Sequence, residues 1–121
     1  MPLSVTCRVD DGFAILELSG TLTLGPSLSN LRESARQAFN TNKISGVILR
    51  VGDVTVTDSA GLGELTVVYT MATNRNCGIR LVDVSASLKR MLQMTRIDEL
   101  LPTSNSLAEA KAELRGKAAR A

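Results

Sequence analysis

Hydrophobic and polar residues alternate along the first part of the chain. Residues 4–9 and 13–19 mix β-branched and other apolar side chains with polar ones, a pattern typical of strands. The turn sequence Asp10-Asp11-Gly12 separates the two runs. Asp-Gly between two strand-like runs favours a tight hairpin, so we expect two antiparallel strands here.

Helical periodicity follows a glycine-bounded piece, 20–25, which we expect to be a short extended segment or a loop. Pro26 suits the first turn of a helix, since its missing N–H costs nothing there. The apolar face of this predicted helix consists of Leu28, Leu31, Ala35, Ala38 and Phe39. Asn40-Thr41-Asn42 is expected to end the helix.

The middle of the chain repeats the change from strand to helix. Residues 47–51 read as a buried strand, because all but Arg50 are apolar. From Leu62 the period becomes helical again, and Asn76-Cys77-Gly78 is expected to end that helix. Residues 79–84 then predict a further short strand.

Two more helices are predicted near the end of the chain. Ser85 can cap the first of them, which should direct Leu88, Met91, Leu92 and Thr95 inward. Pro102 interrupts the chain. Ser106 and Glu109 have the spacing of a capping box for the last helix, which we expect to end near Gly116.

Strands that alternate with helices favour parallel crossovers, while the hairpin adds an antiparallel pair. With 121 residues, the size is that of one domain. We therefore predict a single α/β domain over residues 1–116, with a mixed β-sheet of four to five strands packed with about four helices. Residues 117–121 should fray.

Composition narrows the possible partners. The formal net charge is only +2, and aromatic residues make up 2% of the chain. There is little to attract a phosphate backbone or to stack on bases, so we expect no nucleic acid partner. No apolar run approaches the length of a transmembrane helix, and residues 1–12 do not resemble a signal peptide. The prediction is a soluble cytoplasmic protein without membrane insertion.

The sequence has few of the residues that usually carry out catalysis or bind metal ions. The chain has no histidine, which removes the usual nucleophile pairs and most zinc ligand sets. Cys7 and Cys77 stand alone and are expected to remain reduced. Asp53 and Asp58 by themselves are a weak indication of a metal site. We expect no enzyme, no metal and no cofactor.

The most informative stretch is TDSAGLGEL, residues 57–65, between a predicted strand and a predicted helix. It lacks the glycine spacing of a dinucleotide fingerprint and the Gly-Lys-Ser/Thr of a P-loop. It is not a nucleophile elbow either, since the chain offers no histidine as base. Two explanations remain: a turn in which Asp58 or Ser59 caps the helix, or a serine that another protein modifies.

Modification of Ser59 has a physical rationale. A serine at a helix start beside glycines is accessible to another active site. Phosphorylation would add about −1.5 to −2 charges there, which the helix amides and dipole tolerate. Asp58, Glu64 and any acidic partner surface would oppose that charge. The fold could survive while an interface is lost.

These residues resemble a known family. The strand, DSAGLGEL, the amphipathic helix and GIRLVDVSASLKRMLQMTRIDELLP are similar to the STAS domain of bacterial anti-sigma factor antagonists. The resemblance covers nearly the whole chain. It implies a STAS fold and phosphorylation at Ser59 by an anti-sigma factor that is itself a serine kinase. The unphosphorylated protein would bind that kinase, and a phosphatase would reset the modified form.

The resemblance also implies a partner-binding surface. It comprises Asp58, Ser59, Ala60, Gly61, Leu62, Gly63 and, on a neighbouring loop, Thr23. Thr23 stands where family members usually carry an acidic residue, and Arg50 stands in a strand that often reads L-D-L-S. Two other functions stay open: a STAS interaction subunit without phosphorylation, in a signalling scaffold or lipid transport complex, and a nucleotide or small-molecule receptor.

Overall fold

The computed structural model describes residues 1–41 and 43–120, the last four of them as backbone only. A mixed sheet of five strands lies at its centre, in the order β1-β2-β3-β4-β5. The strands are Ser4–Asp10, Phe13–Leu22, Gly46–Thr57, Gly78–Val82 and Thr103–Ser104. The helices are α1 Ser29–Thr41, α2 Ser59–Asn74, α3 Ala86–Met94 and α4 Leu107–Arg120, with a 3-10 turn η1 at Ile97–Glu99.

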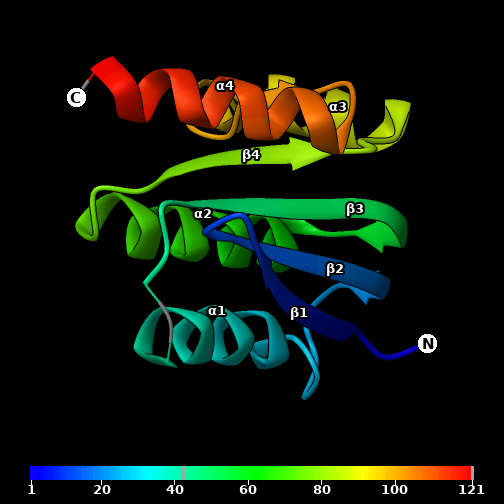
Figure 1. Ribbon diagram of the computed structural model, residues 1–121. Coiled ribbons are helices and arrows are strands. Elements are labelled where there is room, and N and C mark those ends of the chain that lie inside the picture. Colours follow the sequence, from blue (N-terminus) through cyan, green and yellow to red (C-terminus); the bar gives the residue numbers. More distant parts are fainter. Residues whose placement is uncertain (42, 121) are drawn as a thin grey trace.

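Strand direction follows from the connections. β1 and β2 form an antiparallel hairpin, whereas β2, β3, β4 and β5 are mutually parallel. Each parallel step is a crossover that contains helical structure. Helix α1 lies beside β1 and α4 beside β4 (Figure 1). The carboxyl ends of β2 and β3 therefore lie together at one end of the sheet.

Apolar side chains cover both faces of the sheet. The larger cluster joins the sheet to α1, α2 and α3 and includes Leu16, Leu49 and Leu65, all fully buried. A smaller cluster lies under α4, where Ala110 and Leu114 pack against the other face. The β2 and β3 strands carry four consecutive buried residues at positions 13–16 and 46–49, as expected for strands covered on both sides.

The predicted architecture is confirmed, with differences at the ends of elements. β3 continues to Thr57, beyond the predicted end at Val51, because its exposed second half still pairs with the end of β2. Helix α1 begins at Ser29, and Pro26 lies in the preceding turn. The short strand β5 was not predicted, because two residues carry no periodicity.

The two C-terminal helices also differ in detail. Ser85 caps α3 as predicted, its hydroxyl accepting from the Leu88 N–H at 3.1 Å. Thr95 lies just past that helix and is exposed, so its predicted inward position is wrong. Helix α4 continues beyond Gly116 to Arg120. Fraying of 117–121 stays a prediction, and residue 121 lies outside the described residues.

Candidate functional site

Ser59 is the first residue of α2, at the carboxyl end of β3. β3 ends at Thr57, Asp58 is the extended N-cap residue, and the helix begins at Ser59. The Ser59 side chain is exposed. Ligands and partners gather at the carboxyl ends of parallel strands, where helix N-termini also point. The serine thus lies where a second protein can reach it.

Asp58 holds two segments together at this point. Its Oδ1 accepts from the N–H of Gly61 at 2.9 Å, which caps α2. Its Oδ2 accepts from the N–H of Leu24, in the loop between β2 and α1, at 3.0 Å. The pKa of the Asp58 carboxyl is lowered, first by the Leu24 hydrogen bond and then by that of Gly61. Asp58 is therefore both a cap and a link to the neighbouring loop.

The two glycines of the motif have different surroundings. Gly61 is buried, and a Cβ there would lie 1.9 Å from the Leu22 carbonyl oxygen at the end of β2. Gly63 is exposed, and nothing lies within 4 Å of a Cβ built on it. Gly61 permits a close approach of helix to strand, and Gly63 leaves open surface beside Ser59.

The residues predicted to bind a partner differ in how much of each is exposed to solvent. Ser59 and Gly63 are exposed, and Asp58, Ala60 and Thr23 are half-buried. Leu62 is only 4% exposed and packs in the core together with buried Gly61. These two residues support the turn from within. The predicted partner contacts stay a prediction.

Two exposed apolar residues near this turn were missed by the sequence analysis. Leu24 is 80% exposed in the loop that Asp58 holds. Val56 is 55% exposed near the end of β3, where it pairs with Thr21 of β2. The sequence does contain one signal for Leu24, since it is an isolated leucine between Thr23 and Gly25 in a predicted loop. Exposed leucine and valine beside the serine are suited to a protein contact.

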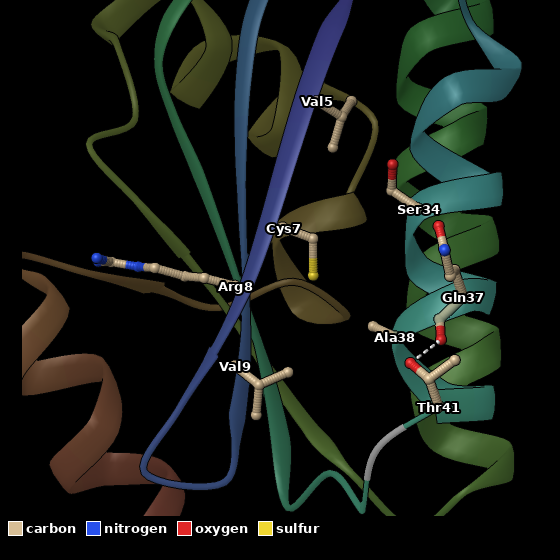
Figure 2. A pocket seen from close by; sticks show the side chains of 8 residues that line it. All are labelled: Val5, Cys7, Arg8, Val9, Ser34, Gln37, Ala38 and Thr41. Carbon is tan, nitrogen blue, oxygen red and sulfur yellow. Dashed lines mark hydrogen bonds between the residues drawn. The ribbon is translucent and has the colours of Figure 1, made fainter.

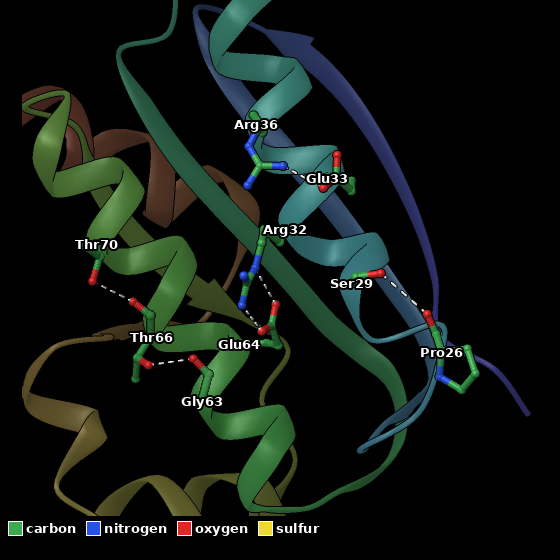
Figure 3. A network of polar contacts seen from close by, with 9 residues as sticks. All are labelled: Pro26, Ser29, Arg32, Glu33, Arg36, Gly63, Glu64, Thr66 and Thr70. Atoms are coloured by element: carbon green, nitrogen blue, oxygen red, sulfur yellow. Dashed lines mark hydrogen bonds and ion pairs between the residues drawn. The ribbon is translucent and has the colours of Figure 1, made fainter.

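Glu64 does not carry an uncompensated charge. Arg32 of α1 binds its carboxylate through two nitrogens, Nη2 to Oε1 at 2.5 Å and Nε to Oε2 at 3.3 Å (Figure 3). The pKa of Arg32 is raised by this hydrogen bond. The expected repulsion between Glu64 and a phosphate on Ser59 is therefore reduced, and Asp58 remains the adjacent carboxylate.

Two cavities of the structure lie away from Ser59. One cavity of about 450 Å³ lies between β1 and α1, and another of similar volume is lined by Tyr69, Glu99 and Pro102 among others. Within residues 1–41 and 43–120, no three acidic or cysteine side chains form a cluster that could hold a metal ion. No helix in the described part of the chain is long and apolar enough to cross a bilayer.

Comparison with known proteins shows to which family this chain belongs. The model of the STAS domain matches residues 4–110, so the chain belongs to the STAS domain family. An anti-sigma factor antagonist from Mycobacterium paratuberculosis superposes with a TM-score of 0.75 at 19% identity, covering 93% of this chain and 94% of the other.

Two further solved structures show the range of proteins that share the fold. The Bacillus cell fate determinant SpoIIAA, in its phosphorylated form, has a TM-score of 0.69 at 14% identity, with 92% and 99% of the two chains covered. The murine anion transporter Slc26a9 matches with a TM-score of 0.74 at 15% identity. There 95% of this chain covers only 22% of the transporter. At such identities the likeness shows the fold.

Proposed function

We propose that this STAS domain is an anti-sigma factor antagonist that acts by partner switching. The unphosphorylated chain binds an anti-sigma factor with serine kinase activity, and phosphorylation of Ser59 releases it. A phosphatase restores the binding form. The observation that carries this proposal is the exposed Ser59 hydroxyl at the first position of α2, on a turn fixed by Asp58. The chain itself performs no catalytic step, and the proposed location is the cytoplasm.

The surroundings of Ser59 support a switch that leaves the fold unchanged. Asp58 already accepts from the Gly61 and Leu24 amides, so the local backbone is held without help from Ser59. A phosphate would add about −1.5 to −2 charges next to the Asp58 carboxylate. The same charge would lie beside exposed Leu24 and would have to be desolvated in any interface covering that residue. Binding should therefore weaken more than folding.

The transporter similarity supports a second candidate function. A STAS fold that matches 22% of a solved anion transporter chain indicates that such domains also occur as parts of longer chains. A chain of this kind could be an interaction subunit that is never phosphorylated. The two candidates differ in whether Ser59 is modified.

The test is intact-mass analysis after incubation with ATP, magnesium and each serine-kinase anti-sigma factor of the same organism. One added phosphate is expected, and peptide mapping should locate it on Ser59. Ser59→Ala should gain none, whereas Thr57→Val, two residues earlier, should be modified like the wild type. No modification by kinases shown to phosphorylate their own antagonists would favour the interaction subunit.

A further inference from the structure

Strand β1 forms an open edge of the sheet, independent of the Ser59 site. Among residues 1–41 and 43–120, β1 pairs only with β2. Six of its seven residues are exposed, so the strand is accessible along its length. An accessible edge strand presents unpaired backbone groups that can accept another strand.

The hairpin geometry identifies which backbone groups point outward. Asp11 and Gly12 have φ of 55° and 83°, as in a type I′ turn, and Asp10 pairs with Phe13 across it. The pair that closes a two-residue hairpin exchanges both hydrogen bonds, and such pairs alternate along an antiparallel ladder. Even-numbered residues therefore bond inward to β2. The N–H and C=O groups of Val5, Cys7 and Val9 point to the free edge.

Strand β1 lacks several of the features that usually protect an edge strand. Natural sheets protect their edges with proline, with charged side chains, lysine above all, or with a β-bulge. Residues 4–10 contain neither proline nor lysine, and their register with β2 is continuous from Ser4 to Asp10. The charged side chains, Arg8 and Asp10, alternate with the residues whose backbone groups face outward. Of the protections found in natural edge strands, β1 keeps the charges of Arg8 and Asp10, whose backbone groups bond inward to β2.

We propose that β1 pairs antiparallel with β1 of a second copy, about a two-fold axis through Cys7. Each outward-facing residue then meets another one, Cys7 opposite Cys7 and Val5 opposite Val9 of the second copy. On the other face Thr6 lies opposite Arg8, and Ser4 opposite Asp10, so no like charges lie directly opposite each other. The two Arg8 side chains are diagonal neighbours, and each lies 4.0 Å from the Glu17 carboxylate of its own copy. An axis through Arg8 would bring two guanidinium groups together, and an axis through Val9 would pair fewer strand residues.

The side chains of the outward-facing residues support this register. Val5, Cys7 and Val9 lie on the α1 side of the strand, and Arg8 points to the other side (Figure 2). They border the cavity of about 450 Å³ that Ser34 and Gln37 of α1 also line. Val9 is 40% exposed. Pairing of two copies joins the apolar stripes and removes Val9 and Cys7 from water. The contact is small, so the dimer should be weak and concentration-dependent.

Sedimentation velocity under reducing conditions tests the proposal. Wild-type protein should shift with concentration from 12.9 kDa toward twice that mass. Cys7→Pro removes an outward N–H but no inward one, so it should remain monomeric and folded. Cys7→Ser, which keeps the N–H, should dimerise like the wild type. Wild-type protein that stays monomeric at concentrations up to about 1 mM, which corresponds to about 4 kcal/mol of binding free energy, overturns the proposal.

Amide hydrogen exchange and disulfide cross-linking test the register of the β1–β1 pair in the wild-type protein. On raising the concentration, the amides of Val5, Cys7 and Val9 should become protected, while those of Thr6 and Arg8 should be slow throughout. With copper phenanthroline and oxygen as oxidant, two Cys7 thiols should form one disulfide, since a hydrogen-bonded pair has a Cα separation of about 5.5 Å. Cys77→Ser should cross-link equally, because Cys77 is buried. The pairing is contradicted if the protection of the Val5, Cys7 and Val9 amides does not change with concentration. It is also contradicted if Cys7 cross-links no faster than expected from random collisions between monomers.

Discussion

The first turn of α2 rests directly on the end of β2 through Gly61 and Leu22. The distance from a Cβ built on Gly61 to the Leu22 carbonyl oxygen is 1.9 Å, and to the carbonyl carbon 2.7 Å. The same carbonyl accepts from the Asp58 N–H at 3.2 Å. Strand β2, the N-cap and the helix are thus fixed together behind Ser59. Only a residue without a side chain allows this contact.

Gly61→Ala should therefore destabilise the protein. The added methyl meets backbone atoms, which cannot rotate away, so α2 must move from β2. We expect a loss of about 1–3 kcal/mol in the free energy of unfolding, the usual cost of overpacking. Urea unfolding followed by circular dichroism measures it.

Gly63→Ala is the matched control, two residues further along the helix. A Cβ at Gly63 meets nothing within 4 Å, and Ala is favoured over Gly in a helix by about 0.5–1 kcal/mol. This variant should be slightly more stable than the wild type. Equal destabilisation by both substitutions would show that the Gly61 effect does not arise from contact with Leu22.

Acid unfolding should report the hydrogen bonds of Asp58. The folded-state pKa of its carboxyl is lowered, so the carboxylate stabilises the fold above its unfolded pKa of about 3.9. This contribution is lost as the pH falls below about 4 and through the folded pKa. Asp58→Asn removes the charge, so the unfolding free energy of the variant should depend less on pH in that window.

The comparison between wild type and Asp58→Asn isolates this residue. Asp10 and Glu113 also have lowered pKa values, but both remain in the variant. Stability measured by urea unfolding at several pH values from about 2 to 6 should therefore converge at low pH, where Asp58 is protonated. Parallel pH curves for the two proteins would argue against a role for the Asp58 charge.

Local sequence signals predicted the elements better than the contacts between them. Periodicity identified four helices and four strands, and Ser106 caps α4 as expected, accepting from the Glu109 N–H at 3.1 Å. In a capping box the Glu109 carboxylate would accept from the backbone N–H of Ser106. Here it accepts from the backbone N–H of Asn105 instead. The Asp58–Leu24 bond joins residues 34 positions apart. It depends on β2 and β3 ending at the same edge of the sheet, which no local pattern specifies.

Substitution of Ser59 should separate binding from folding. Ser59→Ala removes an exposed hydroxyl, so its unfolding free energy should stay within about 0.5 kcal/mol of the wild type, as for most surface changes. The proposed function requires that it still bind the kinase. Ser59→Asp adds a charge beside Asp58 and should weaken binding at least tenfold, or by about 1.4 kcal/mol. Isothermal titration with the kinase measures both; equal affinity of the Ala and Asp variants would contradict charge-driven release.

Leu24 should contribute to partner binding without contributing to the fold. Its side chain is 80% exposed, while its N–H bonds to Asp58 whatever the side chain is. Leu24→Ser should therefore leave stability unchanged but lower affinity for the kinase roughly tenfold or more, since burying a leucine is worth about 1.5–3 kcal/mol. Met94→Ser is the control, because Met94 is similarly exposed, at 78%, but lies far from the Asp58 turn. It is the last residue of α3, and the length of that helix, about 13 Å, separates it from the end of the sheet at which α3 begins. The same calorimetric titration should show a loss for Leu24→Ser alone. A comparable loss for Met94→Ser would place the kinase on a different or much larger surface than the loop that Asp58 holds.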